Sequence, residues 1–259
     1  MRKILIFENP HTLANHLVKL WVSLAKEAIK QNKCFTAALT GGRSPLEFYC
    51  RLSEVKDFSL WSKTHIFITD ERYLPADDKN NNFRMISEAL ISYIDIPQKN
   101  IHPIKTNTVS LASSCQQYEK KLSKFFKLNK GELPRFNFIL LGLGSDGHIA
   151  SLFADAPEER GNNSFGLTAG VSQPHIQYER ISLTMPVINN AENIIFIITG
   201  AGKAEIFEKV LLDKKGRFPA SMVSPKNGNL IYMADSMAAR KLARNKKFKD
   251  LGDCIEVEI

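Results

Sequence analysis

An aspartate and a histidine, Asp146 and His148, lie two positions apart in a glycine-rich segment that directly follows an apolar run at 136–141. Histidine titrates near neutral pH and is the most frequent general base in enzymes. The glycines around this pair can expose backbone N–H groups, which stabilise a negatively charged oxygen in a transition state. The segment therefore predicts a proton-transfer site with His148 as its catalytic group.

Residues 142–147 also match the GxGxxG pattern of dinucleotide-binding proteins. That pattern requires a long helix next, and then an acidic residue about 20 positions further on, at the end of a second strand. Here the following stretch, 154–174, is rich in glycine, asparagine, proline and charge, which indicates irregular structure. We therefore discount a dinucleotide site, and the stretch at 154–174 is a candidate excursion over the active site.

A second glycine-rich turn follows a short apolar run at 35–39. Its glycines allow backbone N–H groups to approach an anion, and its polar side chains can donate further hydrogen bonds. The residues concerned are Gly41, Gly42, Arg43 and Ser44. Ser44 to Glu47 also fits a capping box with Pro45 at the first helical position, so a helix is expected to begin there. The turn alone leaves open whether it binds an anion or only caps that helix.

Charged residues also follow the apolar run at 65–69, where Asp70 and Arg72 come directly after the expected strand. A surface cluster of ion pairs is the alternative interpretation. Two later cations suit a phosphate group: Arg180 at the start of an expected strand, and Lys203 where a glycine-rich turn becomes a helix. Arginine binds phosphate through two parallel hydrogen bonds and lysine as a point charge. Either residue could instead be solvent-exposed.

These residues need a scaffold, and strand and helix patterns alternate along almost the whole chain. The expected strands are 3–7, 35–39, 65–69, 136–141, 181–184, 194–199 and 230–233. The pattern predicts a Rossmann-like, doubly wound α/β fold, with a mostly parallel sheet, helices on both faces and a single domain over residues 1–259. Ligands of such sheets bind outside the carboxyl ends of the strands, so we expect the polar turns to meet there.

Composition narrows the class of protein further. The chain has 259 residues, of which 44% are hydrophobic, enough for a sizeable core. Its longest apolar runs are far too short to cross a membrane, and the apolar run near residue 1 is too short for a signal peptide. The four cysteines are scattered without metal-ligand spacing. We expect a cytoplasmic protein without a membrane partner.

The formal net charge of +8 invites an acidic partner, and much of the excess lies at 240–249. A nucleic-acid site would interleave aromatic residues with the charge, and only Phe248 does so here. We therefore interpret the cluster as the solvated face of a terminal helix and expect no nucleic-acid partner. The rival hypothesis, a nucleic-acid-binding module on a catalytically silent fold, predicts that His148 is dispensable. The sequence leaves the oligomeric state, monomer or weak dimer, open.

Five blocks carry a resemblance to a known family. They are Thr-Gly-Gly-Arg-Ser-Pro at 40–45, Asp-Glu-Arg at 70–72 with Asn82 beyond it, Gly-Leu-Gly-Ser-Asp-Gly-His-Ile-Ala-Ser-Leu-Phe at 142–153, Glu-Arg-Ile-Ser-Leu-Thr at 179–184, and Gly-Ala-Gly-Lys at 200–203. With these blocks in this order, the chain resembles the 6-phosphogluconolactonases of the bacterial type. That family belongs to a superfamily shared with glucosamine-6-phosphate deaminases. The resemblance extends from about residue 3 to residue 235.

The resemblance implies hydrolysis of 6-phospho-D-glucono-1,5-lactone to 6-phosphogluconate, the second step of the oxidative pentose phosphate pathway, with neither cofactor nor metal. It implies that His148 activates water as a general base. Asp146 and Asp70 would orient or assist the histidine, and which of them is its closer partner is left open. Arg72 would contact the substrate. The residues implied around the phosphate or lactone oxygens are Gly41, Gly42, Arg43, Ser44, Asn82, Gly144, Arg180 and Lys203.

The nearest alternative is a deaminase or isomerase acting on glucosamine 6-phosphate. Those relatives follow the same Asp-Gly-His with Ala-Phe-Asn-Glu-Pro, and the glutamate five residues past the histidine assists ring opening. In this chain that position is Phe153. A phenyl ring cannot transfer a proton, so the residues favour the lactonase.

Overall fold

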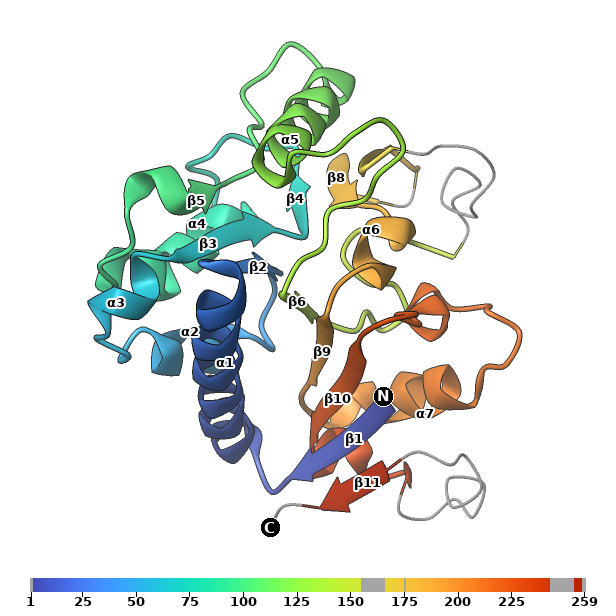
Figure 1. Ribbon diagram of the computed structural model, residues 1–259. Helices are drawn as coiled ribbons and strands as arrows, with labels where there is room; N and C mark the ends of the chain where they lie inside the picture. The colour runs from blue at the N-terminus through green and yellow to red at the C-terminus, as the bar shows by residue number, and fades with distance from the viewer. Residues whose placement is uncertain (1, 155–165, 175, 243–253, 258–259) are drawn as a thin grey trace.

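The computed structural model describes residues 2–154, 166–174, 176–242 and 254–257 (Figure 1). Within them, eight strands form one sheet in which every neighbouring pair is parallel. In sheet order these are β11 (Cys254–Val257), β1 (Arg2–Phe7), β10 (Asn229–Asp235), β9 (Asn193–Ile198), β6 (Phe138–Leu141), β2 (Phe35–Leu39), β3 (Thr64–Ile68) and β5 (Ile101–His102). The predicted mostly parallel α/β fold is confirmed.

The direction of strand addition reverses between β2 and β6. From β2 the chain adds β3 and β5 on one side, and then β6, β9 and β10 on the other. The central strands β2, β6 and β9 are buried along their whole length, as expected for strands covered on both faces. A reversal of this kind opens a crevice at the carboxyl ends of the two strands, which is where ligands of such sheets bind.

Helices cover both faces of the sheet (Figure 1). On one face Trp21 packs against Phe35 and Phe138, with ring centroids 4.9 Å apart in both pairs. On the other face Phe125 lies 5.1 Å from Phe67. The first face carries α1 (Pro10–Asn32), α2 (Leu46–Leu52) and α3 (Phe58–Trp61), and the second carries α5 (Leu111–Phe126) and α7 (Ala204–Leu212). The remaining α-helices of the described residues are α4 (Asn82–Ala89), α6 (Met185–Asn189) and α8 (Ser236–Ala239).

A small antiparallel sheet, in the order β4-β8-β7, adjoins the main one. Its strands are β4 (Asp70–Arg72), β8 (Arg180–Leu183) and β7 (Thr168–Val171). The link is Thr69, whose N–H donates to Leu39 O of the main sheet at 2.9 Å, while its carbonyl accepts from Leu183 N at 2.7 Å. The chain therefore changes sheets at Thr69, which the sequence did not indicate.

The expectation of irregular structure at 154–174 is wrong for part of that stretch. Part of the stretch expected to be irregular, 154–174, forms strand β7, while 155–165 lies outside the described residues. Most of the basic cluster at 240–249 also lies outside them. Among the described residues, no helix has the length and apolar character needed to span a bilayer.

Candidate active site

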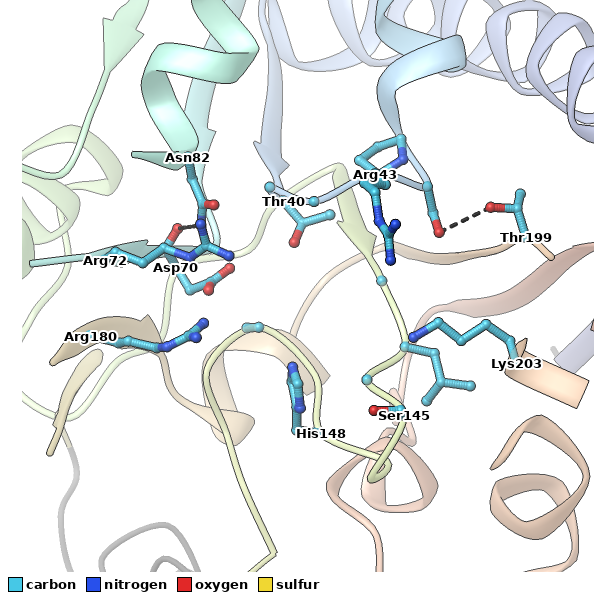
Figure 2. A pocket seen from close by; sticks show the side chains of 18 residues that line it. Thr40, Arg43, Asp70, Arg72, Asn82, Ser145, His148, Arg180, Thr199 and Lys203 are labelled. Carbon is cyan, nitrogen blue, oxygen red and sulfur yellow. Dashed lines mark hydrogen bonds between the residues drawn. The ribbon is translucent and has the colours of Figure 1, made fainter. Parts of the chain in front are cut away.

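A cavity of about 390 Å³ opens over the carboxyl ends of β2, β3, β6 and β9, at the reversal point of the sheet (Figure 2). That size lies within the usual range for small-ligand sites. The predicted site residues that line it are Gly41, Gly42, Arg43, Ser44, Asp70, Arg72, Asn82, Gly144, His148, Arg180 and Lys203. Asp146, the remaining predicted residue, does not line the cavity but contacts His148, which does.

Asp146 is the carboxylate that contacts the histidine ring. Its Oδ1 lies 2.6 Å from His148 Nδ1 and also accepts the backbone N–H of His148 at 3.2 Å. Partial burial acts to raise the pKa of Asp146, but the hydrogen bond and charge of His148 outweigh it and bring the pKa to about 2. An ionised carboxylate can only accept, so in the neutral form of the ring Nδ1 carries the proton and Nε2 is left with a lone pair.

The turn that carries this pair depends on Gly144. Its N–H donates to His148 O at 2.9 Å, and its carbonyl accepts from Gly147 N at 3.2 Å. A Cβ atom at Gly144 would lie 2.2 Å from His148 Nδ1 and 2.5 Å from Asp146 Oδ1. Only glycine leaves room for the ion pair to fold back over the turn.

Asp70 lies elsewhere in the cavity and is held by hydroxyl groups. Its Oδ2 accepts from Ser151 Oγ at 2.7 Å and its Oδ1 from Thr69 Oγ1 at 3.0 Å, and the residue is only 3% exposed. The sequence placed Ser151 near His148 without giving it a role. The structure shows that it joins the histidine segment to strand β4.

Two guanidinium groups occupy one side of the cavity. Arg72 and Arg180 are directly opposite each other on the antiparallel strands β4 and β8. The Nε atoms of both are buried and have no hydrogen-bond partner. Burial, followed by the positive charge of Arg72, lowers the pKa of Arg180. Buried, unpaired donors on adjacent cations create a strong preference for an anionic ligand.

Arg43 and Lys203 lie on the other side, with His148 between the two cationic groups in the view of Figure 2. Burial lowers the pKa of Lys203, Asp146 opposes this shift, and Arg43 adds to it. Lys203 ends the short 3₁₀ turn Ala201–Lys203, which follows Gly200. The N–H of Gly200 donates to Asp235 Oδ2 at 2.8 Å, so the end of β10 fixes this turn.

Gly41 and Asn82 approach each other closely beyond the carboxyl end of β2. A Cβ atom at Gly41 would lie 1.9 Å from Asn82 Oδ1. The Asn82 amide in turn donates to Asp70 O at 2.9 Å. Beside it, burial raises the pKa of Glu71 to about 7, against the opposing effect of backbone N–H donors that include Asn82 and Phe83.

The predicted capping box at Ser44–Glu47 is wrong. Helix α2 begins at Leu46 with Pro45 as its N-cap, and no side chain caps it. Ser44 Oγ instead accepts a hydrogen bond from Thr199 Oγ1 at 3.0 Å. Thr199, a cavity residue that sequence reasoning missed, directly follows strand β9, so the rule that found the other turns could have found it.

Further cavity residues lie within the sequence blocks at 40–45 and 142–153 but were not predicted as site residues: Thr40, Pro45, Gly142, Leu143, Ser145 and Ala150. Ala150 has a positive φ of 46°, which is unusual for a residue with a side chain. Within the described ranges, no group of three or more histidine, cysteine, aspartate or glutamate side chains is arranged to hold a metal ion.

The fold and the site define an open α/β protein with an aspartate–histidine pair in a cationic, small-ligand cavity. Residues 8–232 match the family of glucosamine-6-phosphate isomerases and 6-phosphogluconolactonases. The 6-phosphogluconolactonase of Synechocystis sp. is 35% identical over 219 residues, which cover 83% of this chain and 88% of that protein. The chain belongs to this family, as the sequence blocks predicted.

Two solved structures agree with this assignment. The 6-phosphogluconolactonase of Trypanosoma brucei superposes with a TM-score of 0.83 at 26% identity, over 93% of this chain and 99% of that one. The 6-phosphogluconolactonase of Thermotoga maritima gives a TM-score of 0.77 at 28% identity, over 90% of this chain and 100% of that one.

Proposed function

We propose that this protein hydrolyses 6-phospho-D-glucono-1,5-lactone to 6-phosphogluconate, the second step of the oxidative pentose phosphate pathway. The observation that carries the proposal is that His148, paired with Asp146, lines a cavity whose other charged side chains are mostly cations. A δ-lactone is an activated ester, so its hydrolysis needs a positioned water, a base and a site for the oxyanion. The substrate also carries a phosphate, which calls for the cations.

In the proposed reaction His148 Nε2 takes a proton from water while the water oxygen bonds to the lactone carbonyl carbon. A base placed in this way contributes a rate factor of about 10²–10⁴. The carbonyl oxygen becomes an oxyanion, and backbone N–H groups of the glycine-rich turns stabilise it, typically by about 3–4 kcal/mol. The protonated imidazole then gives its proton to the ring oxygen of the lactone as the bond between that oxygen and the former carbonyl carbon breaks. This leaves the free acid and neutral His148.

Asp146 keeps the ring in the required tautomer throughout this cycle. Because Nδ1–H donates to the carboxylate at 2.6 Å, the second nitrogen is free to accept the proton of water. When the ring becomes positively charged, the adjacent negative charge stabilises it.

The substrate phosphate takes its binding energy from the cavity cations Arg43, Arg180 and Lys203, with Arg72 as a further substrate contact. The unpartnered Nε of Arg180 supports this assignment, since a bound oxyanion would satisfy it. Lys203, half-buried beside the Gly200 turn, adds a point charge.

The alternative, a deaminase acting on glucosamine 6-phosphate, lacks its second acid. Phe153 occupies that position, and its ring centroid lies 4.5 Å from that of His148. The ring also lies 5.7 Å below the guanidinium carbon of Arg180. A phenyl ring provides packing and a cation–π contact at this place, but no proton.

We further propose a single domain in a cytoplasmic protein with the small phosphorylated lactone as its partner. Free cysteines at 34, 50 and 115 suit a reducing compartment. The cations of the cavity serve a small anion, and no polynucleotide is needed to account for them.

The test is a lactonase assay on freshly prepared 6-phosphogluconolactone, corrected for spontaneous hydrolysis, with ammonia release from glucosamine 6-phosphate measured in parallel. The proposal predicts enzyme-dependent lactone hydrolysis and no ammonia. Ammonia release without lactone hydrolysis would establish the deaminase instead.

A further inference from the structure

The segment that follows helix α7 lies directly against the turn that carries His148, although the two are distant in the sequence. Phe218 covers the α-carbon of Gly147: a Cβ atom there would lie 2.6 Å from Phe218 Cδ1 and 2.9 Å from Phe218 Cβ. Ala220, which is fully buried, donates its N–H to Gly147 O at 3.1 Å. Residues 213–221 thus support the turn by packing and by a hydrogen bond.

These contacts act on one peptide group, the bond between Gly147 and His148. Its carbonyl oxygen is held by Ala220 N–H, and its N–H is held by Asp146 Oδ1 at 3.2 Å. Because a peptide group is planar, fixing both of its ends fixes its orientation. The direction in which the His148 side chain leaves the backbone therefore depends partly on Ala220, which belongs to a different segment from the turn.

The supporting segment is itself organised around Asp213. The Asp213 side chain has no exposed surface. Its Oδ2 accepts the N–H groups of Arg217 at 2.6 Å and Phe218 at 3.1 Å, as well as the Ser221 hydroxyl at 2.8 Å. Its Oδ1 accepts Lys215 N–H at 3.1 Å and Arg217 Nε at 3.3 Å. One carboxylate therefore holds successive peptide groups and the far end of the segment.

We propose that Asp213 is a positioning residue for the reaction: it folds residues 213–221 into a rigid support, through which Phe218 and Ala220 fix the direction of His148. The inference rests on the proposed lactone hydrolysis. It assigns a role in turnover to a residue that is outside the cavity and that touches neither substrate nor the histidine ring.

A positioning role and a purely structural one predict different kinetics. Arg43 follows β2, Arg180 belongs to β8, and Lys203 lies at the opposite end of α7 from the supporting segment. Loosening the support should therefore misalign Nε2 while the phosphate contacts remain, so that kcat falls and KM does not change. A general loss of structure would instead affect kcat, KM and the folded fraction together.

The experiment compares Asp213→Ala, Phe218→Ala and the double variant. Phe218→Ala leaves the Asp213 hydrogen bonds to backbone N–H groups possible but uncovers Gly147. We expect each single variant to lower kcat about tenfold with KM within about twofold. We expect the kcat of the double variant to equal that of the less active single variant, because both substitutions act through Gly147. Unchanged kcat in a folded Asp213→Ala protein, or losses that multiply in the double variant, would overturn the inference.

Asp57→Ala is the matched control. Asp57 likewise accepts a backbone N–H, from Leu60, and a serine hydroxyl, from Ser59, but it caps helix α3 away from the cavity. Its kcat should equal that of the unmodified protein. An equal fall of kcat in Asp57→Ala would show that any lost loop carboxylate has this effect, and would overturn the inference.

A second readout separates this inference from the proposed function. The ¹⁵N chemical shifts of the His148 ring report its tautomer and its bond to Asp146 without any substrate. They should change in Asp213→Ala and in Phe218→Ala, and should stay constant in Asp57→Ala. An unmodified protein inactive on the lactone would end the proposed function, while these shifts would still test the support. Ring shifts that remain unchanged in all variants would overturn this inference and leave the proposed function standing.

Discussion

Nδ1 of His148 lies 2.6 Å from Oδ1 of Asp146, and the same oxygen accepts the backbone N–H of His148. The carboxylate thus fixes both the ring and the peptide that carries it. Its low pKa, about 2, which His148 produces against the opposing effect of partial burial, keeps it an acceptor over the whole physiological pH range. The neutral ring consequently has one tautomer, with its proton on Nδ1 and a lone pair on Nε2.

Asp146→Asn tests that tautomer. The introduced amide can donate to Nδ1, which would move the ring proton to Nε2 and remove the base. We expect kcat to fall about 10²-fold or more, with little change in KM, because the wrong tautomer cannot accept a proton from water. Steady-state kinetics measures both constants, and Asp95→Asn, at an exposed loop position, is the control. Undiminished kcat in Asp146→Asn would show that the carboxylate does not select the tautomer.

Lys203→Ala and Arg180→Ala test the phosphate contacts. In the proposed complex each variant loses a charge-assisted hydrogen bond to the phosphate, which is typically stronger than a neutral one by a factor of about two. We expect KM for the phosphorylated lactone to rise about tenfold or more, and KM for an unphosphorylated gluconolactone to change less than about twofold. Lys209→Ala is the control, since Lys209 is exposed and pairs with Glu205 outside the cavity. Equal losses on both substrates would argue against phosphate contact.

Gly41→Ala tests the close approach to Asn82. The added methyl would lie 1.9 Å from Asn82 Oδ1, so the Asn82 side chain or the Gly41 backbone must shift, which disturbs the bond from Asn82 to Asp70 O. We expect a loss of about 1–3 kcal/mol in the free energy of unfolding, typical of overpacking, together with reduced kcat. Urea denaturation measures the first. Gly202→Ala, where a Cβ atom would meet nothing within 4 Å, should leave stability within about 0.5 kcal/mol.

Glu71 predicts a pH dependence of stability. Burial raises its pKa to about 7 from an ordinary value of 4.5, although three backbone N–H groups oppose the rise. A carboxyl whose pKa is raised on folding contributes its full stability below about pH 4.5 and loses it as the pH rises towards 7. The loss should be on the order of 3 kcal/mol at most.

Glu71→Gln, which cannot ionise, supplies the reference for this measurement. The free energy of unfolding of the unmodified protein, minus that of Glu71→Gln, should decrease as the pH increases from 4.5 to 8. A difference that grows over this range would mean that the N–H donors of Arg72, Asn82 and Phe83 keep the carboxylate ionised.

The main features of the site could be predicted because parallel sheets collect the carboxyl ends of their strands at one edge. Apolar runs that end in polar or glycine-rich turns identified the segments at 40–44, 70–72 and 142–148, and the structure brings all three to one cavity. Arg180 opens its strand instead of following it. It reaches the cavity because β8 is antiparallel to β4, which sets it opposite Arg72.

The features that could not be predicted depend on contacts between distant segments. Nothing local to Thr69 indicates that the chain leaves the main sheet there, since the bend is fixed by Leu39 and Leu183. The hydroxyl of Ser44 suits a helix cap equally well, and only the position of Thr199 directs it away from the helix. The bond from Ser151 to Asp70 likewise requires the folded arrangement of both strands.

The most direct measurement is the kcat of His148→Ala on 6-phosphogluconolactone, corrected for spontaneous hydrolysis. His11→Ala, at an exposed position on helix α1, is the control, and circular dichroism verifies the fold of both variants. With His148 as the general base, kcat falls about 10²–10⁴-fold in a folded protein. Turnover equal to that of the unmodified protein would contradict the assignment of His148.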